Sequence, residues 1–164
     1  GQIFLESDLF FSGMRPAVNV GLSVSRVGGA AQTKAMKKAS GSIRIDLAQY
    51  REMEVFTQFS SDLDDATKAQ LAYGGCLMEL LKQPLCNPLS LHQQVITLWT
   101  ATHKKLVHVD KKAVKKYQMD MLEYFDNVYP EIGKEIDESK VLSDELGDKI
   151  LQVADEFKDR AAAK

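Results

Sequence analysis

The stretch VNVGLSVSRVGGAAQTKAMKK, residues 18–38, decides the fold, because the chain changes its character within it. Residues 18–25 are rich in valine and read as a short strand. Residues 30–38 contain neither proline nor glycine and favour a helix. The sequence therefore predicts a boundary near residue 32, with strands before it and helices after it.

Upstream of that boundary, residues 3–5 form a second strand-like run, and Ser12-Gly13-Met14-Arg15-Pro16 is a turn signal between the two runs. Two or three strands are too few for a sheet that is stable alone. These strands therefore lack the partners that a stable sheet requires.

Downstream, the apolar residues recur at helical spacing. Ile43, Leu47 and Tyr50 share one face, and a further helix is expected over residues 64–82. Expected helix starts lie at Ser90, at Asp110 and near Ser143, a loop is expected between Pro84 and Pro88, and Pro130 is expected to follow a helix end. The predicted fold class is mainly α: a bundle of five or six helices preceded by a few strands.

Composition excludes several functions. Of the 164 residues, 45% are hydrophobic and 27% charged, and the net charge is −2, which favours neither nucleic acid nor an anionic membrane as partner. Cys76 and Cys86 provide neither a disulfide framework nor metal-ligand spacing. No apolar run approaches the roughly 18 residues that a membrane span needs.

No metal site is predicted. His92, His103 and His108 lack a zinc-binding spacing, and the carboxylates at positions 62, 64 and 65 suit the start of a helix better than a calcium loop. Lys111, Lys112, Lys115 and Lys116 are interpreted as a solvated helix face, with a protein contact as the second possibility.

A glycine-rich stretch between a strand and a helix, residues 21–34, is a candidate anion site. Arg26 would be its phosphate-binding group, because a guanidinium presents a fixed fork of donors. The phosphate-loop pattern G-x-x-x-x-G-K-[ST] is absent from the chain, however. The residues alone leave open a phosphate-binding site and a purely structural turn.

The pieces GMRPAVNVGLSVSRVGGAAQTKAMK (residues 13–37), LAQYRE (47–52), FSSDLDDAT (59–67) and ELLKQ (79–83) resemble the alpha subunit of F-type, rotary ATP synthases. Beyond Pro88 the similarity is weaker but continues in helical pattern and length. The resemblance implies that residues 1–32 end a central nucleotide-binding domain and that residues 33–164 form the C-terminal helical bundle.

The family resemblance also implies a function. Alternating alpha and beta subunits form a ring around a rotating stalk, and alpha binds nucleotide without turning it over. The family motif SVSRVG places at Arg26 the arginine that reaches a neighbouring beta site as an arginine finger. The alternative is an isolated helical interaction module with no catalytic contribution.

Residues matching Phe10, Arg15, Pro16 and Gln83 line the alpha subunit's own nucleotide pocket in the family. The chain departs from the family pattern at Leu85, where a second glutamine usually stands near the adenine. The resemblance implies ATP or ADP with Mg²⁺ in the full subunit, and no tightly bound cofactor and no ATP hydrolysis in this chain alone.

The implied partners are the beta subunits, the gamma subunit of the central stalk and the delta subunit of the peripheral stalk, without nucleic acid or a direct membrane span. The implied location is peripheral, on the cytoplasmic face of a bacterial plasma membrane or the equivalent side of an organelle membrane. The start, GQIFLESDLF, has neither an initiator methionine nor a basic leader, which predicts a fragment or a processed product.

Overall fold

The computed structural model describes residues 1–57 and 63–162. Within these ranges the backbone forms nine helices: α1 (Ser7–Phe11), α2 (Arg26–Ala31), α3 (Lys34–Ala39), α4 (Ile43–Thr57), α5 (Asp65–Leu81), α6 (Leu91–Thr102), α7 (Val114–Val128), α8 (Pro130–Ser139) and α9 (Asp144–Ala162). The mainly helical class predicted for the chain is confirmed.

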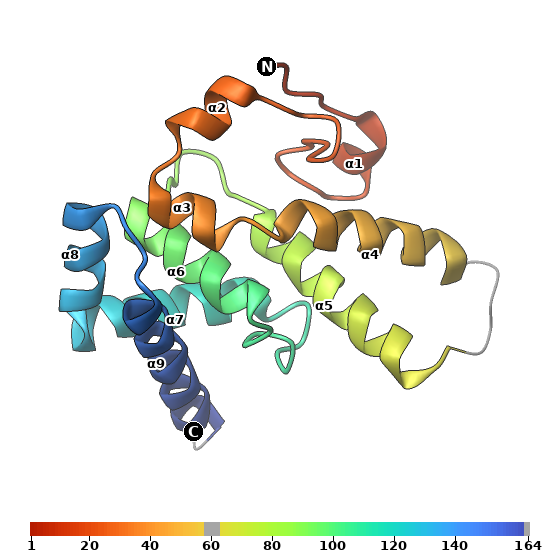
Figure 1. Cartoon of the computed structure of the whole chain (residues 1–164). Helices are drawn as coiled ribbons and strands as arrows, with labels where there is room; N and C mark the ends of the chain where they lie inside the picture. The colour runs from red at the N-terminus through yellow and green to blue at the C-terminus, as the bar shows by residue number, and fades with distance from the viewer. Residues whose placement is uncertain (58–62, 163–164) are drawn as a thin grey trace.

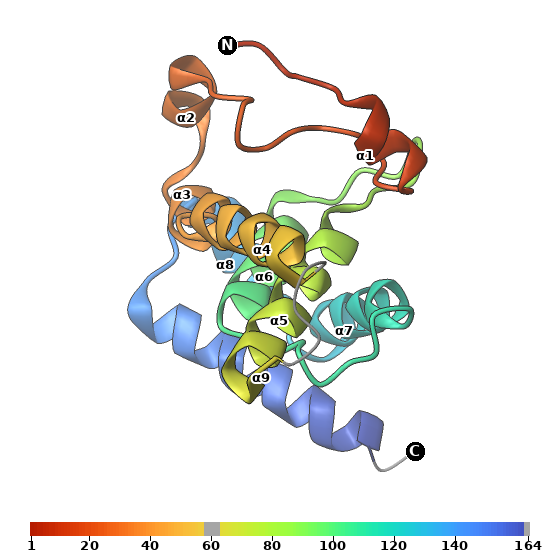
Figure 2. The ribbon, with the colours of Figure 1, turned by 90° about the vertical axis from the view of Figure 1, so that its right-hand side faces the viewer.

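Helix α6 is the centre of the helical layer. It packs against α3, α7, α8 and α9, while α4 and α5 pair with each other and α5 also contacts α7. Figures 1 and 2 show α4 and α5 as a protruding hairpin, and the N-terminal segment with α1 and α2 as an arch above α3 and α4. The arch brings residues near the N-terminus close to the loop between α5 and α6.

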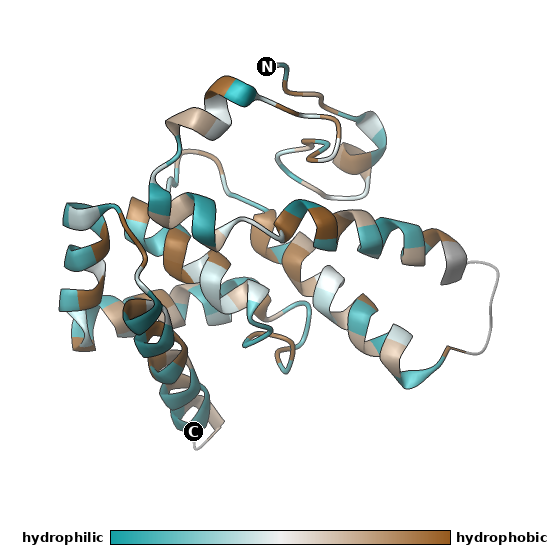
Figure 3. Cartoon of the chain, viewed as in Figure 1, coloured by the Kyte–Doolittle hydropathy of each residue, from teal (hydrophilic) through white to brown (hydrophobic). Residues whose placement is uncertain are grey.

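The core follows the inward faces of the helices, where hydrophobic positions gather in Figure 3. Val95 and Ile96 on α6 are fully buried, and they belong to one cluster with Met121 on α7 and Ile150 on α9. The prediction that Ile43, Leu47 and Tyr50 face inward from α4 is confirmed, since all three are buried.

The predicted strands are wrong. Among the described residues the only β-pairing is an isolated antiparallel bridge between Leu5 and Val18. Asn19 ends the pairing, because its side-chain oxygen accepts a hydrogen bond of 3.0 Å from the amide of Leu22 and bends the chain. The Ser25 hydroxyl then accepts from the amide of Gly28 at 2.9 Å and starts α2. With no third strand, these local bonds outcompete a ladder.

Three of the predicted helix starts are confirmed. Ser143 lies directly before α9, and its hydroxyl accepts from the Leu146 amide at 3.1 Å. Asp64 caps α5 by accepting from the Thr67 amide at 2.7 Å. At α6, Ser90 and Gln93 form a reciprocal capping box. After Asp64 and after Ser90 the apolar residues recur at helical spacing, which is why both starts could be predicted.

Two other predictions about helix ends need correction, and a third is correct but incomplete. The expected helix over residues 30–38 is divided, because Thr33 caps a new helix, α3, through the Met36 amide. Asp110 binds the Lys112 amide within a turn, and α7 begins later, at Val114. Pro130 follows the end of α7 at Val128, as predicted, and it is also the first residue of α8, a helix that was not predicted; its missing N–H costs nothing there.

None of the helices in the described ranges has the length and apolar character required to cross a membrane.

Candidate functional site

A surface pocket of about 480 Å³ lies where the turn after α1 meets the loop between α5 and α6, with α7 as its third wall. Its lining residues are Gly13, Arg15, Lys82, Gln83, Pro84, Asn87, Leu89, Lys115, Gln118 and Met119. A volume of this size matches that of sites for small organic ligands.

The turn and the loop are joined by their backbones. The amide of Gln83 donates a hydrogen bond of 2.9 Å to the carbonyl oxygen of Arg15. Gly13, at φ +88°, supplies a left-handed conformation that directs the chain into this turn, and a cis peptide bond joins Arg15 to Pro16. The bond fixes Arg15 and Gln83 as neighbours at the pocket.

Arg15 also contacts α1. Its guanidinium carbon lies 4.3 Å from the centroid of the Phe10 ring, a cation–π arrangement that holds the long side chain over an aromatic face. Phe10 remains 46% exposed, so one of its surfaces is open. Arg15 and Phe10 together present a flat, charged platform beside the pocket.

The α7 wall carries a polar chain that continues into the core. The ammonium of Lys115 donates to the carbonyl oxygen of Leu80 at 2.7 Å and to Oε1 of Gln118 at 3.0 Å. The amide nitrogen of Gln118, which is 1% exposed, donates to the Thr97 hydroxyl at 3.1 Å. The half-buried position of Lys115 lowers its pKa below the usual value for lysine, because burial penalises the charged form.

The four residues expected to bind nucleotide are thus partly assembled. Arg15 and Gln83 line the pocket. Phe10 contacts Arg15 but is not itself a lining residue, and Pro16 follows Arg15 in sequence without lining the pocket. Leu85, at the expected position of a second glutamine, is 94% exposed and lies outside the lining.

Lys115 is the main residue that sequence analysis misplaced. It was grouped with Lys111, Lys112 and Lys116 on a solvated face, whereas the structure inserts it between α5 and α7. Its position two helical turns before the buried Leu122 is the local signal that it turns inward.

Arg26 is not among the residues that line this pocket; it is the first residue of α2, the helix labelled in Figure 1. Its side chain is exposed, and within residues 1–57 and 63–162 no group hydrogen-bonds or ion-pairs with its guanidinium. Ser25, which caps the helix, fixes the backbone at this point. The guanidinium is therefore free to bind a group outside the chain.

Other candidates have structural partners. The ring of His92 bridges two carboxylates, with Nδ1 2.6 Å from Asp137 and Nε2 3.2 Å from Asp126. Asp64 caps α5, and position 62 lies outside the described residues. In the part of the chain that the structure describes, no three His, Cys, Asp or Glu side chains are grouped as a metal site would require.

Cationic side chains dominate the charged part of the pocket's lining. Among the described residues that line it, there is no carboxylate, imidazole, thiol or hydroxyl. Its charged groups, Arg15, Lys82 and Lys115, are all cationic donors. Such a wall suits a ligand rich in acceptors.

The helical part of the chain corresponds to a known class of domain. The family model described as "ATP synthase alpha/beta chain, C terminal domain" matches residues 32–157. The chain belongs to this ATP synthase family.

Its relatives identify the subunit type. The chain is 50% identical over 160 residues to ATP synthase subunit alpha of Aquifex aeolicus, covering 98% of this chain and 32% of that protein. It is 52% identical over 158 residues to ATP synthase subunit alpha of Clostridium botulinum, covering 96% of this chain and 31% of that protein. The chain spans about a third of the length of the curated relatives it matches. The resemblance to the alpha subunit is confirmed.

Proposed function

We propose that this chain is the C-terminal part of a non-catalytic alpha subunit in the ring of an ATP synthase, where it supplies Arg26 to a beta-subunit site. The observation that carries the proposal is the 50% identity to an ATP synthase subunit alpha across 98% of the chain. Residues 1–32 are proposed to end the central nucleotide-binding domain, and residues 33–164 to form the C-terminal bundle.

The surroundings of Arg26 support its role as an arginine finger. The guanidinium is exposed and unpaired among the described residues, on a helix whose start is fixed by the Ser25 cap. A planar fork of donors matches phosphate oxygens and stabilises charge on a transferring phosphoryl group. A guanidinium that was ion-paired with a carboxylate of its own chain would not be available to bind phosphate oxygens at a neighbouring site.

The pocket supports a role in nucleotide binding. Arg15 and Gln83 meet through a 2.9 Å backbone bond, and Phe10 lies under the Arg15 guanidinium. We propose that Phe10, Arg15, Pro16 and Gln83 bind the base of a nucleotide whose phosphates and Mg²⁺ contact other parts of the full subunit. The lining residues contain no carboxylate for a metal ion, which fits a base-binding role.

Association with other subunits is favoured by the exposed apolar residues of the arch. Hydrophobic side chains of residues 1–27 that are more than half exposed are Ile3, Leu5, Phe11, Leu22, Val24 and Val27. Exposed apolar side chains in such number on one short segment are typical of a surface that a partner covers. We propose that beta subunits and the rest of the alpha subunit cover it, and that the gamma and delta subunits are further partners in the complex.

The proposed setting is peripheral, on the cytoplasmic face of a bacterial plasma membrane or the equivalent side of an organelle membrane. There the complex would couple ATP synthesis or hydrolysis to the transport of protons or sodium ions. Both statements rest on the family alone.

Assembly tests the proposal. Native mass spectrometry of the complete alpha subunit, alone and mixed with beta subunits, is expected to show a larger mixed species. Val27→Asp, which places a charge beside Arg26 on the arch, is expected to reduce the amount of the mixed species. Val128→Asp, at the exposed end of α7, is expected to leave that amount unchanged. No mixed species for the unaltered subunit would favour the alternative, a helical module that acts outside a ring.

A further inference from the structure

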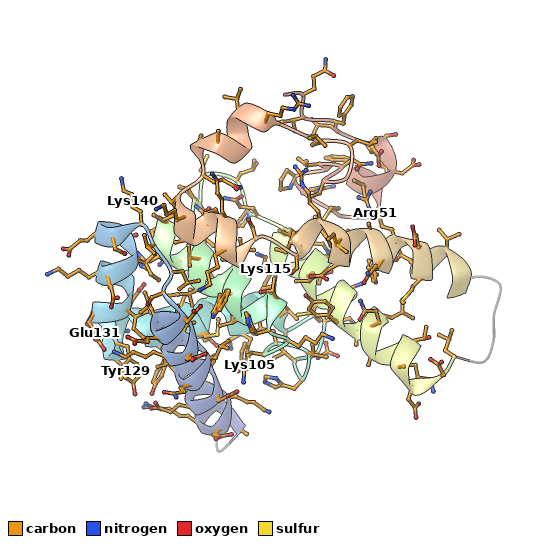
Figure 4. All side chains as sticks on the ribbon, viewed as in Figure 1. Arg51, Lys105, Lys115, Tyr129, Glu131 and Lys140 are labelled. Atoms are coloured by element: carbon orange, nitrogen blue, oxygen red, sulfur yellow. The ribbon has the colours of Figure 1, made fainter. Side chains whose placement is uncertain are left out.

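The ammonium group of Lys115 has more hydrogen-bond donors than the acceptors found for it in the described part of the chain. Two of its three ammonium protons bind the Leu80 carbonyl and Gln118 Oε1, both of which are neutral acceptors. Among the described residues no carboxylate lies within 4.0 Å of its Nζ, and the nearby Glu79 is held by Lys82 at 2.6 Å. One N–H of Lys115 remains for a ligand in the pocket, which Lys115 lines (Figure 4 labels it).

The rest of the wall offers few acceptors to a ligand. The Oε1 of Gln118 accepts from Lys115, and its amide nitrogen donates to Thr97, so both ends of this side chain are occupied. Arg15 adds further donors from the opposite wall. Among the described side chains that line the pocket, Gln83 and Asn87 carry the two amides besides Gln118, and each can present either a donor or an acceptor. The donor-rich composition selects against a ligand edge that also donates.

The purine bases differ in this respect at position 6. Guanine and hypoxanthine present O6 beside N7, two acceptors, while adenine presents an N6 amino donor beside N7. A lysine ammonium, which only donates, can pair with both O6 and N7 of the first edge, but with N7 alone on the second, where the N6 amino group opposes it. At position 85, where the family pattern has a glutamine near the base, this chain has an exposed leucine.

We infer that the pocket prefers a 6-oxopurine nucleotide over an adenine nucleotide, and that Lys115 is the residue that determines this specificity by donating to O6 of the base. The inference rests on the proposed role of the pocket in nucleotide binding. The competing explanation is that Lys115 only satisfies the last carbonyls of α5, which is a structural role.

The first test changes the ligand and leaves the protein untouched. The 164-residue chain, labelled with ¹³C at its methionine methyl groups, is titrated with the monophosphates of guanosine, inosine, adenosine and purine riboside, which lacks any group at position 6. The Met119 methyl reports on the pocket, and the fully buried Met121 methyl reports on the fold. Inosine monophosphate is expected to bind about tenfold more tightly than purine riboside monophosphate, because O6 adds a bond to a charged donor.

The second test changes the lysine. Lys115→Met keeps the aliphatic stem and removes the donor, and Lys116→Met is the matched control on the exposed neighbour. Lys115→Met is expected to abolish the difference between the inosine and purine riboside monophosphates, and Lys115→Arg to restore it, while Lys116→Met retains it. If Lys115→Met loses the native Met121 signal, the ligand series on the unaltered chain decides alone.

The outcomes separate the inference from the proposed function. If all four nucleotides shift Met119 with equal affinity, or the adenine nucleotide binds most tightly, the pocket binds nucleotides and the inference about Lys115 is wrong. If none of them shifts Met119 at millimolar concentration while the Met121 signal is native, the nucleotide role of the pocket fails, and the inference fails with it.

Discussion

Gly74 on α5 lies directly against the aromatic ring of Tyr50 on α4, with no space between them for a β-carbon. Tyr50 is buried, and its hydroxyl donates to Glu54 at 3.1 Å on the solvent side of the same helix. The close approach of ring and backbone sets the separation of the α4–α5 hairpin. Gly75, the next residue, has no atom within 4 Å of the position that its β-carbon would take.

Gly74→Ala is therefore expected to destabilise the chain, and Gly75→Ala is not. The methyl group at position 74 must displace the Tyr50 ring, at a cost of about 1–3 kcal/mol. At position 75 the same change fills open space and gains up to about 1 kcal/mol of helix propensity. Urea unfolding of both variants measures the difference, and equal stabilities would show that the helices do not meet at Gly74.

The capping box at α6 provides a second prediction. Ser90→Ala removes the acceptor for the Gln93 amide and is expected to lower the free energy of unfolding by about 1 kcal/mol. Ser7→Ala is the control, because no side-chain hydrogen bond of Ser7 occurs among the described residues. Equal losses in the two variants, measured by thermal unfolding, would contradict the role of the cap.

Local sequence signals predicted the middle of the chain well and its first third badly. The starts of α5 and α6 were predictable because each cap binds an amide only three residues away. The strands failed because a run of valines indicates strand propensity and says nothing about whether partner strands are present. Helix α8 was missed because Pro130 was taken to follow a helix end, although Ile132 and Ile136 follow at helical spacing.

The candidate site shows a similar limit. Arg15 and Gln83 were named together only through family resemblance, since no local pattern reports contact between residues so far apart in sequence. Lys115 was predicted to face solvent, because its three lysine neighbours on the same stretch do so. Its burial depends on the end of α5 at Leu81 lying against α7, and that packing between helices is not visible in the local sequence.

Because of the Cys76 thiol, the free energy of unfolding is expected to depend on pH in the alkaline range. Burial, together with the charge of Glu79, raises the pKa of Cys76 from 9.0 to about 11. As the pH rises, the unfolded chain therefore loses this thiol proton before the folded chain does. The contribution of the protonated Cys76 thiol to the free energy of unfolding is fully present below pH 9 and is lost as the pH rises to 11. The pKa of Tyr50 and that of Tyr117, each raised by burial to about 12, add losses only above pH 10.

Unfolding by urea at pH 8, 9 and 10 checks this behaviour. The free energy of unfolding is expected to fall with pH above 9 in the unaltered chain and in Cys86→Ala, whose thiol is exposed. Cys76→Ala is expected to show a shallower fall. The lowered pKa of Lys115 acts in the opposite direction but is common to all three proteins, so it cancels from the comparison. Parallel curves for all three would refute the assignment to Cys76.

The role proposed for Arg26 leads to the largest expected effect on activity. In the complete ring, Arg26→Lys keeps the positive charge but loses the planar fork that contacts two phosphate oxygens at once. Arginine fingers contribute on the order of 10³–10⁵ in rate in related phosphoryl transfers. Arg160→Lys, on the exposed end of α9, is the matched control and is expected to leave turnover unchanged.

The most direct test of the central claim measures multisite ATP turnover and native mass on the same preparation of the Arg26→Lys ring. The account predicts an intact ring, with nucleotide still bound at the beta sites and turnover reduced by orders of magnitude. An intact ring that turns over ATP at a near-normal rate, or a ring that falls apart, would contradict it.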